Sequence, residues 1–320
     1  MKLGMLTAMF GDKPLKDVLD IINPLKLDVI ELGTGNYPGG PHCPVDELLD
    51  SKPKQTALLD MVKGAGLSIS ALSCHGNCLH PDKDFAKKNQ DVQTKTIRLA
   101  EQMGVSVVID FSGCPGSDPD AKKPAWVTCA WPPDYIETLE WQWNEVVLPY
   151  WKKQAQFAKD HGVKVAFEAH PGFVVYNTET LLKLRNACGP QLGCNFDPSH
   201  FFWQGMEPCE MVLALKDAIF HVHAKDSRVE PRNVALNGVN DAKHYGDEIN
   251  RSWIFRTCGY GHGLEWWKNF FSNLRLAGYD GAISIEHEDS LMSSKEGLTK
   301  AVRFLRDAMI EEAPSAMTWA

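Results

Sequence analysis

The sequence has no apolar run that approaches the roughly 20 residues of a membrane-spanning helix, so no membrane partner is expected. Its apolar start, Leu3 to Phe10, is short and lacks an A-x-A-like cleavage site, which indicates a first strand and not a signal peptide. No cluster of Lys and Arg stands out, and the formal net charge is −8. A nucleic-acid partner therefore has no electrostatic basis, because such partners are held by basic surfaces.

Cysteine is present but lacks the spacings of metal or redox motifs. The nine cysteines lie between Cys43 and Cys258, and none forms a Cys-x-x-Cys pair. An odd number in this arrangement argues against a disulfide framework and against a structural zinc knuckle. The pattern favours a reducing, cytoplasmic location.

What the sequence does contain is a regular alternation between short apolar runs and longer segments of helical periodicity. A hydrophobic fraction of 44% and a charged fraction of 23% are typical of soluble globular proteins. The apolar runs predict strands at Leu3–Thr7, Leu27–Leu32, Leu67–Ser73, Ser106–Asp110, Lys164–Glu168, Gly193–Asp197, Ile219–His223 and Ala282–Glu286. The periodic segments predict helices at Leu15–Asn23, Thr56–Ala65, Gln90–Met103, Trp141–Asp160, Thr178–Ala187, Pro208–Lys216, Leu264–Leu276 and Ser294–Glu311.

Strand–helix units repeated in this way predict parallel strands, because parallel pairing needs a crossover that a helix supplies. In a chain of 320 residues they predict an α/β protein with a single (β/α)8 TIM barrel domain over residues 1–320. An open, doubly wound sheet is the alternative, but the segment Thr7–Asp12 lacks the G-x-G-x-x-G fingerprint. Two long loops, residues 111–133 and 226–262, both follow a strand, so both are expected on the catalytic face.

The last four predicted strands each end in a side chain that binds metals. They end in Glu168, Asp197, His223 and Glu286. Neighbouring strand ends of a barrel lie side by side on one rim, so these side chains are predicted to hold one divalent ion. An oxygen-rich set with a single nitrogen favours Mn²⁺, with Mg²⁺, Co²⁺ and Zn²⁺ as alternatives. An ion with open positions would polarise a hydroxy-carbonyl substrate and stabilise an enediolate.

Each of these residues taken alone has a simpler interpretation as a helix cap or ion-pair partner; Asp197, before Pro198, is suited to cap the next helix. Their recurrence at four consecutive strand ends favours the metal site. His221 shares a strand face with His223 and is expected one layer deeper, as a hydrogen-bonded packing residue. His170 and His75, which also follow strands, are predicted to contact substrate hydroxyl groups, with a structural role as the alternative.

At these motifs the sequence resembles the xylose isomerase-like TIM-barrel superfamily, which includes sugar phosphate isomerases/epimerases, ketose 3-epimerases and inosose dehydratases. The resemblance rests on Phe167-Glu168-Ala169-His170, Asp197-Pro198-Ser199-His200, His221-Val222-His223-Ala224-Lys225-Asp226 and Ile285-Glu286-His287. It implies that Glu168, Asp197, His223 and Glu286 bind the metal. It also implies that the two glutamates form the acid/base pair, on opposite faces of the substrate. His200, three residues after the Asp, and Arg228, shortly after the seventh strand, are by the same resemblance substrate contacts.

These features predict a metal-dependent isomerase or epimerase of a keto-sugar or related polyol, with Glu168 and Glu286 as catalytic residues. A dehydratase or lyase acting on keto-inositols or 3-keto-glycosides, similar to C-glycoside deglycosidases, is the first alternative, because elimination starts from the same enolate. A phosphodiesterase resembling endonuclease IV needs more histidine ligands and a basic surface, which the net charge of −8 opposes. The full ligand set also argues against a non-catalytic subunit. A homo-oligomer or a partner subunit, and the identity of the carbohydrate substrate, are left open.

Overall fold

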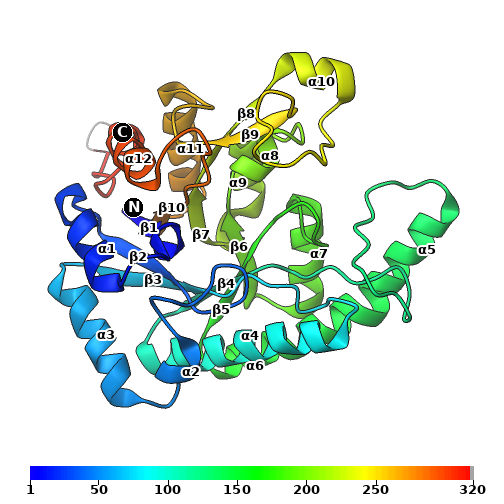
Figure 1. Cartoon of the computed structure of the whole chain (residues 1–320), viewed down its shortest axis with the longest axis horizontal. Helices are drawn as coiled ribbons and strands as arrows, with labels where there is room; N and C mark the ends of the chain where they lie inside the picture. The colour runs from blue at the N-terminus through cyan, green and yellow to red at the C-terminus, as the bar shows by residue number, and fades with distance from the viewer. Residues whose placement is uncertain (318–320) are drawn as a thin grey trace.

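The computed structural model describes residues 1–317 and contains a closed barrel of parallel strands (Figure 1). Around the barrel the strands follow the order β1-β10-β7-β6-β5-β4-β3-β2. Their bounds are β1 (Lys2–Leu6), β2 (Val29–Gly33), β3 (Ser68–Ser73), β4 (Val107–Asp110), β5 (Lys164–Glu168), β6 (Leu192–Phe196), β7 (Ile219–Ala224) and β10 (Ala282–Ile285). Because β1 pairs in parallel with both β2 and β10, the sheet has no free edge. The predicted (β/α)8 barrel is confirmed.

Helices surround the barrel and connect its strands (Figure 1). They are α1 (Leu15–Ile22), α2 (Val45–Leu48), α3 (Lys52–Gly64), α4 (Lys83–Met103), α5 (Pro133–Trp141), α6 (Leu148–Asp160), α7 (Thr178–Cys188), α8 (Ser199–Phe202), α9 (Pro208–Leu215), α11 (Leu264–Leu276) and α12 (Ser294–Ala308). In the described chain, residues 1–317, none of the helices is long and apolar enough to cross a membrane.

Two predicted helices differ most from the structure in their bounds. The helix expected to begin at Gln90 begins at Lys83, because the side chain of Asp82 accepts hydrogen bonds from two backbone N–H groups of the first turn. The helix expected over Trp141–Asp160 begins earlier, at Pro133 of α5, and continues through a π-helical segment, Gln142–Val147, into α6. Sequence periodicity did not indicate either feature.

The barrel and its helices are held together by buried apolar side chains. Trp151 of α6 packs edge-on against Phe167 of β5, with ring centroids 4.4 Å apart. Both are almost completely buried, as are Leu3 and Ile283 on the paired strands β1 and β10. Burial of such side chains contributes roughly 1.5–3 kcal/mol each. This core fixes the strand ends that carry the polar residues described below.

The segment predicted as a long loop over residues 226–262 has secondary structure of its own. It contains the antiparallel strands β8 (Asp226–Val229) and β9 (Trp253–Arg256) and the helix α10 (Pro231–Asn237), which stand above the barrel in Figure 1. The segment follows β7 directly, so it lies at the carboxyl end of the barrel strands. The other predicted loop, residues 111–133, contains no helix or strand before Pro133 and leads into α5, which projects to the side in Figure 1.

Candidate metal centre

Four side chains from neighbouring barrel strands converge at the carboxyl end of the barrel. Glu168 is the last residue of β5, Asp197 follows β6, His223 lies on β7 and Glu286 follows β10. Each residue offers one ligand atom, and these atoms all lie within 4.8 Å of one another. They meet because β5, β6, β7 and β10 are consecutive strands around the barrel. The structure thus brings the four predicted ligands together; that they bind an ion stays a prediction.

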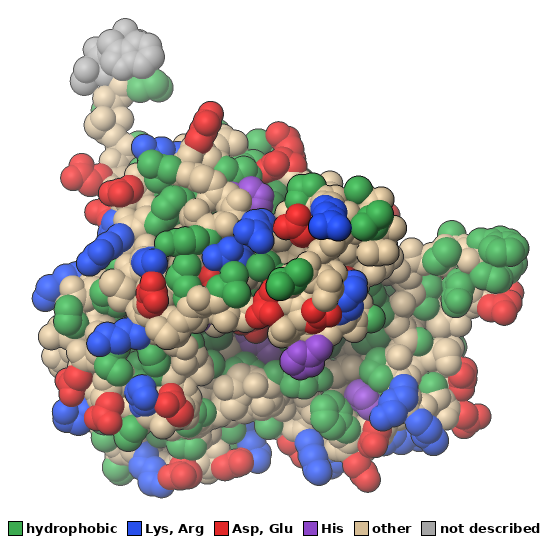
Figure 2. All heavy atoms as spheres, turned by 45° about the horizontal axis from the view of Figure 1, so that its top comes forward, with side chains coloured by type: hydrophobic (Ala, Val, Ile, Leu, Met, Phe, Trp, Pro, Cys, Tyr) green, Lys and Arg blue, Asp and Glu red, His purple; other side chains and the backbone are tan. Residues whose placement is uncertain are grey.

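The cluster adjoins an open cavity of about 400 Å³, which we call the polar cavity. Glu168, Glu286, His75 and Phe111 are among the residues that line it. Figure 2 shows a hollow on this face of the molecule, with histidine side chains inside it and acidic side chains beside it. A concave site with a few convergent polar groups is typical of small-molecule binding.

Glu168 is held by several hydrogen-bond donors. Its Oε2 atom lies 3.0 Å from Nε2 of His75 and 3.2 Å from Nδ2 of Asn195. Its Oε1 atom lies 2.9 Å from Nε2 of His200, whose Nε2 is also 3.2 Å from Oδ2 of Asp197. His75 and His200 were predicted as substrate contacts, and the structure places both against a proposed metal ligand. Of the two, His75 lines the polar cavity.

Lys225 supplies a buried positive charge beside the cluster. Its Nζ atom lies 2.8 Å from Oε2 of Glu286, 3.1 Å from Oδ2 of Asp197 and 3.0 Å from Oε2 of Glu288. The Lys225 side chain is only 2% exposed, so its ammonium group balances the buried carboxylates of Asp197 and Glu286 away from solvent. Sequence reasoning assigned Lys225 no role in the site, because Lys225 and Arg228 are two cations near a barrel rim, which is too common a feature to indicate one.

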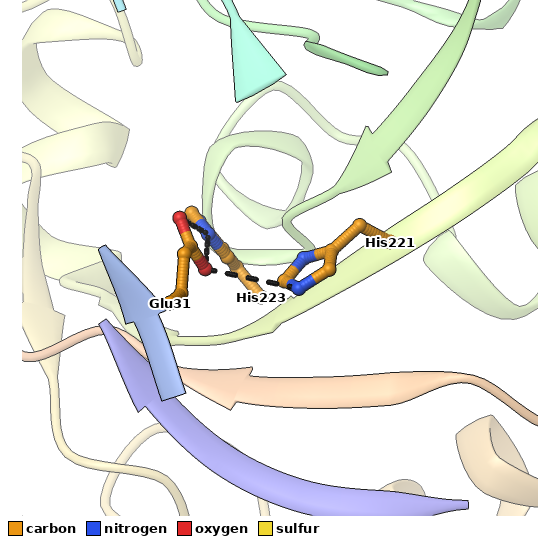
Figure 3. A group of neighbouring side chains, drawn as sticks. All are labelled: Glu31, His221 and His223. Atoms are coloured by element: carbon orange, nitrogen blue, oxygen red, sulfur yellow. Dashed lines mark hydrogen bonds and ion pairs between the residues drawn. The ribbon is translucent and has the colours of Figure 1, made fainter. Parts of the chain in front are cut away.

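Glu31 in the middle of β2 is a further buried acid that sequence reasoning missed. Figure 3 shows its carboxylate, carried by β2, facing His223 and His221 of β7. Oε2 of Glu31 lies 2.9 Å from Nε2 of His223, and the hydroxyl of Ser73 donates to Oε1. The only signal in the sequence is one acidic residue inside the otherwise apolar run Val29-Ile30-Glu31-Leu32.

His221 occupies the deeper layer, as predicted. It is buried, and its ring nitrogens lie 3.0 Å from Oδ1 of Asn195 and 3.3 Å from the hydroxyl of Ser70. Its Nε2 atom is 3.8 Å from Oε2 of Glu31, which is longer than a hydrogen bond. His221 therefore packs beneath the cluster and is not one of the four convergent ligands.

The donor set fits one divalent cation. Nδ1 of His223 and Oδ2 of Asp197 are buried and make no directed hydrogen bond with any residue in the range 1–317. Nδ1 lies 3.1 Å from an oxygen of Glu168 and 3.1 Å from an oxygen of Glu286, so it faces the other ligands. Buried polar atoms without a directed hydrogen bond are uncommon in proteins, and a cation would give both atoms a ligand bond in addition to their ion-pair neighbours. Three carboxylates and one imidazole suit a hard or borderline divalent ion.

Charges within the site keep the carboxylates ionised. Burial alone would raise the pKa of Glu286, but the ammonium group of Lys225 lowers it to about 2. Burial would likewise raise the pKa of Glu168, yet the histidines that donate to it, His200 first, hold the pKa well below its usual range. For His200, burial disfavours the charged form, but Asp197 and Glu168 raise its pKa to about 9. Ionised carboxylates are the form that binds a cation.

The two remaining predicted contacts lie farther from the cluster. His170 follows β5 and packs against His200 and Phe111, with ring centroids 4.1 Å and 5.0 Å apart. Its Nδ1 atom is 2.6 Å from the carbonyl oxygen of Pro171, and burial lowers its pKa to about 3. Arg228 lies on β8, half-exposed, with its guanidinium 3.7 Å from Glu230, and it is not among the described residues that line the polar cavity.

Comparison with known proteins places the chain in a family. Residues 19–308 match the family described as the xylose isomerase-like TIM barrel. The chain belongs to this family. The chain is similar to the uncharacterized protein YfiH of Bacillus subtilis (strain 168). The two are 40% identical over 312 residues, which cover 97% of this chain and 99% of that protein. An inosose dehydratase of Clostridium botulinum (strain Alaska E43 / Type E3) is 34% identical over 171 residues, covering 52% and 55% of the two chains.

Solved structures share the fold at low sequence identity. A structure of the IolI protein with a bound zinc atom superposes with a TM-score of 0.64 at 17% identity, covering 96% of this chain and 98% of that one. A D-psicose 3-epimerase of Clostridium cellulolyticum H10, solved with D-tagatose, superposes with a TM-score of 0.61 at 13% identity, covering 97% and 99%. These likenesses show the xylose isomerase-like barrel fold.

Proposed function

We propose that this member of the xylose isomerase-like TIM barrel family is a divalent-metal-dependent enzyme that isomerises or epimerises a small polyhydroxy ketone. The observation that carries the proposal is the convergence of Glu168, Asp197, His223 and Glu286 within 4.8 Å beside the polar cavity. Mn²⁺ is the proposed ion, since three of the four ligands are carboxylates. When bound, it would polarise the substrate carbonyl and stabilise the negative charge of an enediolate.

Glu168 and Glu286 are the proposed acid/base pair, and both line the polar cavity. One carboxylate takes the proton from the carbon next to the carbonyl, and the other, once it has taken up a proton from water, returns that proton to the opposite face. His75 and His200 point their Nε2 atoms at Glu168, 3.0 and 2.9 Å away, and so hold that carboxylate in one orientation. A carboxylate held in one orientation loses less entropy when it reaches the reactive geometry, which lowers the activation barrier.

Dehydration is a second candidate, and it is supported by the likeness to an inosose dehydratase over about half of the chain. The first step is the same removal of a proton next to the carbonyl. The hydroxyl on the following carbon then takes up a proton and leaves as water, so a double bond forms where epimerisation would return the proton. The four convergent residues serve either outcome, and the substrate decides between them.

The proposal is tested by proton exchange in D₂O. Purified protein with Mn²⁺ is incubated with a panel of ketoses and inososes, and the products are followed by NMR. We expect deuterium at the carbon next to the carbonyl of an epimer or isomer, whereas dehydration would be recognised by the loss of water from the substrate. Replacing Glu286 by Gln should slow the exchange by roughly 10²–10⁴-fold.

Glu137→Gln is the matched control, because Glu137 is an exposed glutamate of α5. It should exchange at the wild-type rate. Wild-type exchange in Glu286→Gln, or no exchange with any ketone of the panel, would refute the proposed function.

A further inference from the structure

The segment 226–262 lines part of a second cavity of about 460 Å³, which we call the apolar cavity. It is lined by His170, Tyr245, Ile254, Phe255, Glu288 and Ser290. Ile254 and Phe255 come from β9, and Tyr245 from the segment between α10 and β9. The walls therefore consist mainly of aromatic and aliphatic groups, whereas carboxylates and histidines converge on the polar cavity.

The two cavities adjoin next to the proposed metal ligands. Glu288 lines both of them, and its Oε2 atom lies 3.0 Å from Nζ of Lys225, the group that contacts Glu286. On the other side, Phe111 of the polar cavity packs against His170 of the apolar cavity, with ring centroids 5.0 Å apart. The two cavities therefore share Glu288 as a lining residue and lie on either side of the Phe111–His170 contact.

The wall formed by the segment 226–262 is ordered by aromatic stacking. The rings of Tyr245 and Phe255 are nearly parallel, with centroids 5.8 Å apart, and the rings of Trp203 and Trp253 stack at 4.6 Å. The guanidinium of Arg251 lies over Tyr245 and over Trp253, at 4.3 and 4.7 Å from the ring centroids. Such packing gives a preformed surface, which an incoming apolar group need not organise.

We propose that the apolar cavity binds an aromatic or other apolar substituent of the substrate, while the ketone end of the same molecule occupies the polar cavity. This inference rests on the proposed function for the ketone end. The ring of Tyr245 and the side chains of Ile254 and Phe255 present apolar surface, so an apolar ring would gain from burial against them. The shared lining residue Glu288 and the contact between Phe111 and His170 are the reason to assign both cavities to one ligand.

The test compares two probes that differ only in the substituent: the phenyl and the methyl β-glycosides of 3-keto-glucose, titrated calorimetrically into the Mn²⁺-loaded protein. The wild-type protein should bind the phenyl compound about tenfold more tightly, the gain expected from burying one ring. Two variants alter the cavity from different sides. Tyr245→Ala removes a half-exposed aromatic ring that lines the cavity. Ser290→Trp places a large side chain in the cavity from an exposed position.

Both variants should reduce the preference for the phenyl compound to less than about threefold and leave the affinity for the methyl compound within about twofold. Tyr135→Ala, at another half-exposed tyrosine on α5, is the matched control and should keep the wild-type preference. Equal affinities in the wild type, an unchanged preference in both variants, or no binding of either probe would overturn the inference. So would binding of phenol alone as tight as that of the phenyl glycoside, which would indicate an independent ligand.

The outcomes separate this inference from the proposed function. If ketoses exchange protons but the phenyl preference is absent, the apolar cavity is misassigned and the proposed function stands. If the phenyl preference is present but no ketone exchanges protons, the substrate site is supported and the proposed reaction is wrong.

Discussion

Nε2 of His223 lies 2.9 Å from Oε2 of Glu31, and this contact leaves Nδ1 as the nitrogen that faces the other proposed ligands. Metal-binding histidines commonly donate their second ring N–H to a carboxylate, which fixes the tautomer and the ring orientation. Glu31 is therefore a positioning residue for the metal centre. The hydroxyl of Ser73 holds the carboxylate from its other oxygen.

Glu31→Gln should weaken Mn²⁺ binding by roughly 10–100-fold, because an amide cannot accept hydrogen bonds at both positions from Ser73 and His223. The dissociation constant is measured by calorimetry. Glu47→Gln, at an exposed glutamate that pairs with Lys54, is the control and should bind like the wild type. The same affinity in both variants would show that Glu31 does not position His223.

Lys225→Met should destabilise the metal-free protein by about 3 kcal/mol, because it leaves buried carboxylates without their counter-charge. Saturating Mn²⁺ should recover a large part of this loss, since the ion supplies positive charge to the same carboxylates. Urea unfolding with and without Mn²⁺ measures both quantities. Lys300→Met, which breaks an exposed pair with Glu296, should change stability by less than about 1 kcal/mol. An equal loss with and without Mn²⁺ would contradict a shared role of lysine and ion.

The metal affinity should fall as the pH falls. In the metal-free protein, burial disfavours the charged form of His223, but Glu31, Glu168 and Glu286 raise its pKa well above the usual value. The ring therefore holds a proton that the ion must displace, and more acid favours the proton. Below the raised pKa, each drop of one pH unit should weaken Mn²⁺ binding by about tenfold if one proton is released. An affinity independent of pH would argue against His223 as a ligand.

The stacking of Trp253, in the segment 226–262, on Trp203 should contribute to the free energy of unfolding. Trp253 is buried against Trp203 and under Arg251, so Trp253→Ala should lower the free energy of unfolding by about 3–5 kcal/mol. Trp131→Ala removes a tryptophan that is 76% exposed and should cost less than about 0.5 kcal/mol. Urea unfolding compares them. Similar losses would mean that the segment 226–262 is not ordered by this stack.

The barrel and the convergence of its four strand-end residues were predictable from the sequence. Runs such as Val165-Ala166-Phe167-Glu168 combine an apolar strand with a terminal polar residue, and barrel topology places neighbouring strand ends together. The strand-end pattern is local in the sequence, and the meeting of neighbouring strand ends follows from the fold class. The same reasoning placed His221 below His223, because side chains two apart point to one face of a strand.

The rest of the site depends on spatial relationships that the sequence does not display. Glu31 approaches His223 from a distant strand, and Lys225 is buried only because three acidic side chains surround it. The strands β8 and β9 are short and far apart in sequence, so periodicity did not reveal their pairing. The apolar cavity, which requires that pairing, was for the same reason not predictable.

The central claim is that Glu168, Asp197, His223 and Glu286 bind one divalent cation, and anomalous diffraction from crystals grown with Mn²⁺ tests it most directly. We predict a single manganese peak within bonding distance of Nδ1 of His223 and of an oxygen of each carboxylate. The absence of a peak between these four side chains, or a peak held instead by Glu31 and His221, would contradict the account.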